Sequence, residues 1–139
     1  MIPDDMAALH AKAFSATRAW SSQEFADLLN HPGTFCQGNN DCFILIRVVA
    51  DEAEVLTLAT DPVKRRQGLA RRVLGMAEQA AADAGACEIF LEVAEDNSPA
   101  QALYAAENYR QVGRRPGYYL PKNAAPVAAL VLRKALKTN

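Results

Sequence analysis

The chain has 139 residues, of which half are hydrophobic, and its 15 basic and 16 acidic residues leave a net charge of −1. This length and composition predict one domain, residues 1–139, with a well-formed core. So small a net charge excludes a global field that would attract nucleic acid or an anionic membrane, and we expect neither as a partner.

The three cysteines, Cys36, Cys42 and Cys87, are odd in number and show no Cys-x-x-Cys spacing, so neither a disulfide framework nor a zinc site is indicated. We expect Cys87 to fill the core. His10 and His31 each stand alone, and no metal is predicted. The N-terminus lacks a secretion signal, and no apolar run reaches the length of a membrane span. These features predict a cytoplasmic protein.

Two helices are predicted first. Apolar residues at helical spacing indicate a helix over about 4–14. Ser21 to Glu24 has the pattern of a capping box, which begins a second helix that ends at Asn30. An opening β-strand before the first helix is expected to be missing or reduced to a stub.

Three strands follow, over 34–37, 42–49 and 53–60, because β-branched and aromatic residues are concentrated there between polar turns. Their order along the chain predicts an antiparallel meander. The middle run is apolar on both alternating faces, which predicts helices on both sides of the sheet.

The strongest helical pattern lies between Gln67 and Ala84, with Gly85 placed to end the helix. Its expected buried stripe is Leu69, Val73, Met76, Ala77, Ala80 and Ala84. A strand over 88–93 comes next. It is followed by a helix that Ser98 can cap and Pro99 can begin, and that runs to about Glu107, so this part should contain a parallel crossover.

The last part of the chain predicts two more strands. Asn108 can adopt the left-handed turn that closes the preceding helix, and strands are expected over 109–114 and 127–132, with a turn at Pro116-Gly117 between them. The expected fold is mixed α/β (α+β), with a mostly antiparallel central sheet flanked by helices.

Gly68 stands at the start of the strongest helix, a position typical of anion sites. The first N–H groups of a helix lack internal partners, and the helix dipole adds partial positive charge, so backbone alone can hold a pyrophosphate. Five cations surround this position: Lys64, Arg65, Arg66, Arg71 and Arg72. An ordinary turn beside a solvated helix end is the alternative. No Walker loop or Gly-x-Gly fingerprint is present.

The stretch Arg65-Arg66-Gln67-Gly68-Leu69-Ala70 resembles the Gln/Arg-x-x-Gly-x-Gly/Ala signature of the GNAT acetyltransferase superfamily. The position of this stretch in the chain, after the predicted meander and before a strand-helix pair, also resembles the order of elements in that superfamily's fold. Leu91-Glu92-Val93, Asn97 and Ala102-Leu103-Tyr104, followed by Tyr118-Tyr119, look like the RimI-type branch, which acetylates the N-terminal alanine of ribosomal proteins. Asn108-Tyr109 replaces the Gly-Phe common in the family.

The resemblance implies acetyl-CoA as co-substrate and assigns its contacts by position. Residues expected to bind it are Leu58, Ala59 and Thr60 through their backbone, then Arg65, Arg66, Gln67, Gly68, Leu69, Ala70 and Arg71 around the pyrophosphate, and Asn97. The resemblance also implies Glu92 as general base and Tyr104 as general acid.

Elementary chemistry agrees with these two roles. An amine arrives largely as ammonium, which has no lone pair, so a carboxylate must remove a proton before the amine attacks a thioester. The leaving thiolate needs a proton, which a tyrosine retains at neutral pH. Glu88 and Glu95 could act in place of Glu92, although alternation places only Glu88 on the face of Glu92. Glu92 could also be a solvated residue, and Tyr104 a packing residue.

Three functions remain open. The acceptor is expected to be a protein N-terminus, possibly of a ribosomal protein, with a small amine or another protein as alternatives; a non-catalytic acyl-CoA-binding module is the third. Acceptor choice depends on loops near 15–22 and 114–120, where Tyr118 and Tyr119 could wall a peptide groove or simply pack. A monomer or weak dimer is expected.

Overall fold

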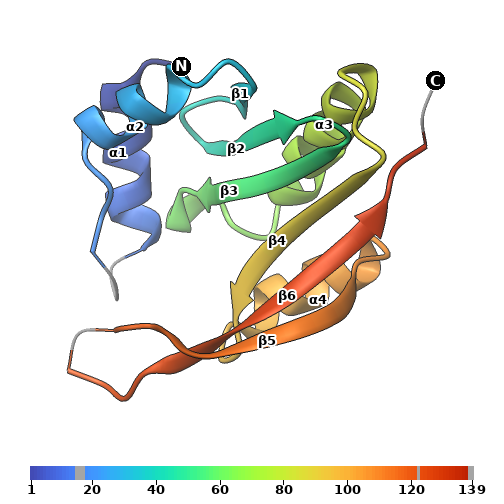
Figure 1. Cartoon of the computed structure of the whole chain (residues 1–139). Coiled ribbons are helices and arrows are strands. Elements are labelled where there is room, and N and C mark those ends of the chain that lie inside the picture. The colour runs from blue at the N-terminus through green and yellow to red at the C-terminus, as the bar shows by residue number, and fades with distance from the viewer. Residues whose placement is uncertain (15–17, 122, 138–139) are drawn as a thin grey trace.

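The structure, a computed structural model, describes residues 1–14, 18–121 and 123–137 and shows a six-stranded sheet with helices on both faces (Figure 1). In chain order the elements are α1 (Pro3–Ala13), α2 (Ser22–Leu29), β1 (Thr34–Gly38), β2 (Cys42–Val49), β3 (Glu52–Thr60), a 3-10 turn η1 (Pro62–Lys64), α3 (Leu69–Asp83), β4 (Glu88–Ala94), α4 (Ser98–Ala106), β5 (Arg110–Tyr119) and β6 (Val127–Ala135). The predicted mixed α/β class is confirmed.

The strand order in the sheet is β1-β2-β3-β4-β6-β5. Every neighbouring pair is antiparallel except β3 and β4, which α3 connects as the predicted parallel crossover. In the described residues the chain enters the sheet only at β1, after both early helices, and no strand precedes α1 there.

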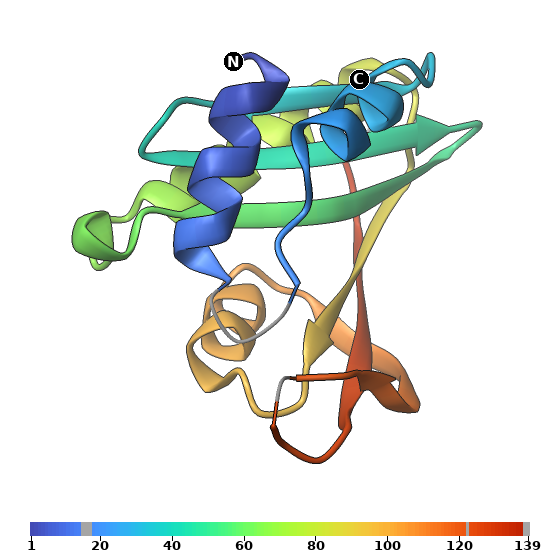
Figure 2. The same ribbon diagram turned by 90° about the vertical axis from the view of Figure 1, so that its left-hand side faces the viewer.

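Two clusters of apolar side chains lie on opposite faces of the sheet. Met6, Phe25 and Phe43 lie in the cluster under α1 and α2, which cover β1 to β3. Leu74 of α3 and Leu91 of β4 lie in the larger cluster on the other face, which also includes Tyr104 of α4. Figure 2 shows α1 and α2 in front of β1–β3, with no helix in front of the lower part of β4, β6 and β5. That part of the sheet is therefore open on the α1/α2 side.

The buried stripe of α3 is rotated relative to the prediction. Leu74, Ala81 and Ala82 are buried with Val73 and Ala77, whereas Met76 is 41% exposed. The helix carries alanines on several faces, and alanine spacing alone does not determine which face turns inward. Contact with the sheet decides it.

Two predicted boundaries were wrong. Asn97, and not Ser98, caps α4: its side-chain oxygen accepts a hydrogen bond from the Ala100 N–H at 3.2 Å. Pro116-Gly117 lies inside β5, where the register shifts between Arg115 and Tyr119, and is not a turn between strands. Proline is tolerated there because β5 is an edge strand, bonded to a neighbouring strand on one side only, so not every N–H group of β5 has to donate to another strand.

His10 is a pH-sensitive element of the first cluster. His10 is 3% exposed, its ring lies 4.9 Å from the Trp20 ring, and its Nδ1 accepts a hydrogen bond from the Trp20 backbone N–H at 3.3 Å. Burial lowers the pKa of His10 to about 4, with a smaller opposing effect of Glu24 and a smaller reinforcing effect of Arg18. The native state therefore disfavours the protonated ring.

We expect the stability to be constant above pH 6.5 and to fall as the pH drops from about 6.5 to 4, because only the unfolded chain then binds a proton at this ring. The loss should be about 2–3 kcal/mol at most. Denaturant unfolding across this range measures it, and His10→Phe should flatten the slope. An equal slope in this variant would assign the effect to other groups.

Candidate active site

The parallel pair β3 and β4 forms a fork. The strands pair only where Glu52–Glu54 of β3 meet Glu88–Phe90 of β4, and beyond these residues they diverge (Figures 1 and 2). A register shift against β2 leaves Leu56 as an extra residue in β3, a bulge that bends the strand. The fork is thus closed at Glu54 and open toward Thr60 and Ala94.

The β3 arm presents backbone groups to the opening. The Asp61 N–H donates to the Asp41 carbonyl at 2.8 Å, so these two residues form a hydrogen-bonded pair. In an antiparallel ladder every second residue pair is hydrogen-bonded, so this bond shows which residues of β3 bond to β2. In this register Ala59 turns its N–H and C=O toward β2, whereas those of Leu58 and Thr60 point into the fork. Of the three residues expected to offer backbone bonds, two are therefore oriented to do so, and Ala59 is not.

The chain then turns into α3 through a segment with two left-handed residues. Arg66 has φ 66° and Gly68 has φ 75°. Gly68 is the N-cap, and no side chain caps the helix. A Cβ atom at Gly68 would meet nothing within 4 Å, so the space beside this residue is open. This helix start has the form of an anion site.

The charges around this helix start are those of a phosphate-binding surface. Arg65, Arg66, Gln67 and Arg72 are exposed, and the first turn of α3 has no acidic residue. Leu69 and Ala70 are half-buried and pack on the larger core cluster. Arg71, one of the residues expected around the pyrophosphate, is paired within the chain, with its Nε 2.5 Å from Glu107 Oε1. Asn97 is exposed, with its oxygen engaged in capping α4.

Glu92 lies on the other arm of the fork. Its neighbours Leu91 and Val93 point into the larger core cluster, so alternation directs Glu92 to the open α1/α2 side of the sheet. Glu92 Oε1 accepts a hydrogen bond from Arg115 of β5 at 2.7 Å. Its other oxygen is buried and has no partner in the described part of the chain. An incoming cation could satisfy that oxygen.

Tyr104 approaches the fork from the opposite face. It is 7% exposed on α4, and burial raises its pKa, with further contributions from Tyr119 and Cys42. Tyr119 in turn interacts with Glu92, and burial together with that carboxylate raises the pKa of Tyr119 to about 12. Tyr119 therefore interacts electrostatically with both Tyr104 and Glu92. Tyr104 keeps its proton at any physiological pH.

The two other carboxylates considered from the sequence are occupied elsewhere. Glu88 lies at the closed end of the fork, 2.9 Å from Arg133. Glu95 lies past the end of β4 and accepts two hydrogen bonds from Arg114. Glu92 is the one of the three with a buried oxygen that lacks a partner in the described residues.

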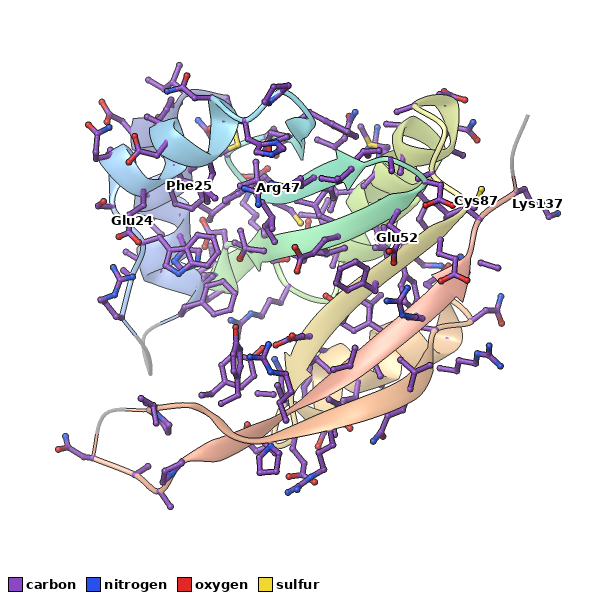
Figure 3. The ribbon with its side chains drawn as sticks, in the orientation of Figure 1. Glu24, Phe25, Arg47, Glu52, Cys87 and Lys137 are labelled. Carbon is purple, nitrogen blue, oxygen red and sulfur yellow. The ribbon has the colours of Figure 1, made fainter. Side chains whose placement is uncertain are left out.

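The prediction that Cys87 fills the core was wrong, because its side chain is exposed. Figure 3 shows it near Glu52 and Lys137, and its N–H donates to the Asp51 carbonyl at 2.6 Å. It precedes β4, and the end of the chain returns beside it, so its side chain reaches solvent at the closed end of the fork.

Sequence reasoning missed two residues of this region, Glu54 and Arg115. Glu54 sits on β3 at the last paired position of the fork, and Arg115 covers Glu92. The alternation of β3 could have singled out Glu54 as a carboxylate on the face opposite Ala53 and Val55. No sequence signal pointed to Arg115, which acts across strands. Of the predicted acceptor loops, residues 15–17 lie outside the described residues, and residues 114–119 belong to β5.

Across the described ranges, no three His, Cys, Asp or Glu side chains are grouped so as to hold a metal ion. Within the same ranges, no helix has the length and apolar character needed to cross a bilayer.

Comparisons of the sequence and of the structure with known proteins point to the same family. A family model described as the acetyltransferase (GNAT) family matches residues 6–108. The chain is 32% identical over 118 residues to the ribosomal protein bS18-alanine N-acetyltransferase of Escherichia coli K12, covering 81% of this chain and 79% of that protein. The crystal structure of the E. coli ribosomal-protein-S18-alanine N-acetyltransferase superposes with a TM-score of 0.86 at 25% identity, covering 99% of this chain and 89% of that one.

An uncharacterized protein of Mycobacterium leprae is 43% identical over 84 residues, which cover 60% of this chain. The chain spans only 22% of the length of that relative.

Proposed function

The chain belongs to the GNAT family of acetyl-CoA-dependent N-acetyltransferases, and we propose from this that its acceptor is the α-amine of a protein N-terminus, with an N-terminal alanine of a ribosomal protein as the first candidate. A 32% identical relative with that activity supports the choice. The observation that carries the proposal is the position of Glu92 on the sheet face whose lower part α1 and α2 do not cover. Such an acceptor would place the enzyme in the cytoplasm.

We assign the binding of acetyl-CoA to the β3 arm and the start of α3. The uncapped N–H groups behind Gly68 and the arginines Arg65, Arg66 and Arg72 suit a pyrophosphate. The inward-facing backbone groups of Leu58 and Thr60 suit an amide-bearing arm that runs along β3. When bound, acetyl-CoA supplies an activated acetyl thioester at the fork.

Glu92 is proposed to take one proton from the acceptor's ammonium group, which gives the nitrogen the lone pair it needs. The N–C bond then forms, the C–S bond breaks, and Tyr104 donates its proton to the leaving sulfur. The nitrogen loses two protons in all. The proton on Glu92 passes to solvent, and the second proton replaces the one that Tyr104 gave to the sulfur.

Direct attack on the thioester is favoured over an acetyl-cysteine route. Burial raises the pKa of both Cys36 and Cys42, which disfavours the reactive thiolate. Cys42 is also within 3.2 Å of the Thr60 hydroxyl. Cys87 lies at the closed end of the fork, away from Glu92. None of the three is placed as a nucleophile.

Tyr104→Phe should lower kcat about a hundredfold, because it removes only the acidic hydroxyl. Tyr109→Phe is the matched control. The ring of Tyr109 lies 5.6 Å from that of Tyr104, and its hydroxyl donates to Glu78 at 2.7 Å. This control should lose about 1–3 kcal/mol of stability and keep its turnover. Steady-state thiol release and thermal unfolding measure the two effects, and equal turnover losses would remove Tyr104 from the mechanism.

Mass spectrometry of peptides incubated with the protein and acetyl-CoA tests the acceptor. We expect one acetyl group on the α-amine of peptides that begin with alanine, and none on the same peptides with a blocked N-terminus and a free lysine. Modification of a polyamine or an aminoglycoside instead of the peptides would make the enzyme a small-amine acetyltransferase. Binding of CoA without acetylation of any amine would indicate a non-catalytic module.

A further inference from the structure

Glu54 is a half-buried carboxylate at the closed end of the fork for which the mechanism above has no role. It pairs with Phe90 of β4 in the sheet register, and Glu92 follows two residues later, about 7 Å along the strand. Both carboxylates lie on the α1/α2 side of the sheet, because their neighbours Val55 and Leu91 belong to the cluster on the other side. The two side chains therefore border the same space.

The charges around Glu54 are unbalanced. No ion pair of the described chain includes Glu54. Arg47 of β2, its cross-strand neighbour, directs Nε to the Thr34 hydroxyl at 3.2 Å, and Figure 3 shows Arg47 on the α1/α2 side of the sheet. Burial raises the pKa of Glu54; the charge of Glu92 raises it further, and Arg47 opposes both. Arg47 thus offsets only part of the free energy that it costs to bury the ionised carboxylate of Glu54.

Glu92 adds a second unsatisfied group to the same space, since one of its oxygens is buried without a partner in the described residues. In the described chain Arg115 is the one cation bonded to it, and Tyr119, which interacts with that arginine, is neutral at physiological pH. Of these two half-buried carboxylates only Glu92 has a bonded arginine among the described residues, so together they attract a further cation. An α-amine is largely such a cation at neutral pH.

We propose that Glu54 is a second carboxylate of the acceptor site, which binds the acceptor's ammonium group together with Glu92 before the proton is removed. This inference rests on the proposed acetylation of a protein α-amine. Glu54 orients the cation from the closed end of the fork, and Glu92 removes its proton. The ammonium also satisfies the buried oxygen of Glu92.

The test compares Glu54→Gln with Glu52→Gln in the full chain. Glu52 lies two residues earlier on the same strand and face, is exposed, and pairs with Arg133 at 2.8 Å, so its variant removes an equal charge outside the site. Glu54→Gln should raise the KM of an alanine-starting peptide about tenfold or more and leave the KM of acetyl-CoA unchanged. Glu52→Gln should stay within about twofold of the wild type.

The N-acetylated product peptide separates charge recognition from shape. It has no ammonium group, so it should inhibit the wild type and Glu54→Gln equally. Equal weakening of substrate and product in Glu54→Gln would mean that Glu54 only shapes the site, and the inference would fall. Equal kinetics of the Glu54 and Glu52 variants would also overturn it.

A second measurement needs no acceptor. In carboxyl-labelled free enzyme, the NMR titration midpoint of Glu54 should fall when Glu92 is replaced by Gln, because the neighbouring charge is gone. An unshifted midpoint would show that the two carboxylates do not share a site. Failure of the proposed acceptor would appear differently, as peptides left unmodified by the wild-type enzyme.

Discussion

Replacing Glu92 by Gln is expected to lower kcat about a hundredfold or more at neutral pH, with little change in the affinity for acetyl-CoA. Glutamine keeps the size of the side chain but cannot accept the ammonium proton. The substitution lies on β4, across the fork from the backbone groups and helix start assigned to the co-substrate. Thiol-release kinetics give the turnover, and calorimetry with CoA gives the affinity.

Glu95→Gln is the matched control for this variant. Both carboxylates bond an arginine of β5, Arg115 for Glu92 and Arg114 for Glu95, so each variant loses one charge and one ion pair of the same kind. Only Glu92 faces the fork. Unchanged turnover in Glu92→Gln, or equal losses in both variants, would exclude Glu92 as the base.

Gly68→Trp is expected to raise the KM of acetyl-CoA by more than tenfold while the enzyme remains folded. A side chain at this position extends into the open space beside Gly68, at the uncapped start of α3, which is the space assigned to the pyrophosphate. It also sits at φ 75°, where a residue other than glycine costs roughly 1–2 kcal/mol. Initial rates at varied acetyl-CoA and thermal unfolding separate the two effects.

Gly85→Trp is the matched control, because it introduces backbone strain of the same kind away from the proposed pyrophosphate site. Gly85 lies just past the C-terminal end of α3, has φ 99°, and a Cβ there also meets nothing within 4 Å. We expect a comparable loss of stability and an unchanged KM for acetyl-CoA. If both variants lose affinity to the same degree, the anion site does not lie at Gly68.

Much of the fold could be predicted from the sequence because its signals are local. The capping box from Ser21 to Glu24 forms as expected, and Asn108 and Gly85 have the left-handed conformations that end their helices. The errors arose where local chemistry allows two solutions. Asn97 and Ser98 are both good caps, and Pro116-Gly117 is compatible with either a turn or an irregular edge strand.

The candidate site was predictable to the extent that it lies in continuous segments. Gly68 and its neighbouring arginines, and Glu92 on its strand, are close in sequence to the features that point to them. Contacts between distant segments were not predictable: Arg115 covers Glu92 from 23 residues away, Arg71 is held by Glu107, and Glu54 faces Glu92 across the fork. No periodicity encodes such pairs.

The sequence by itself determined the elements and the helix start suited to an anion, because backbone propensity and side-chain chemistry act over a few residues. The two proton-transfer candidates came from the resemblance of the sequence to the GNAT superfamily. Only the tertiary structure decided which groups meet. The bulge at Leu56 and the short pairing of β3 with β4 open the fork, and that opening sets Leu58, Thr60 and Glu92 around one space. Strand divergence depends on packing across the whole sheet, which no short stretch of residues specifies.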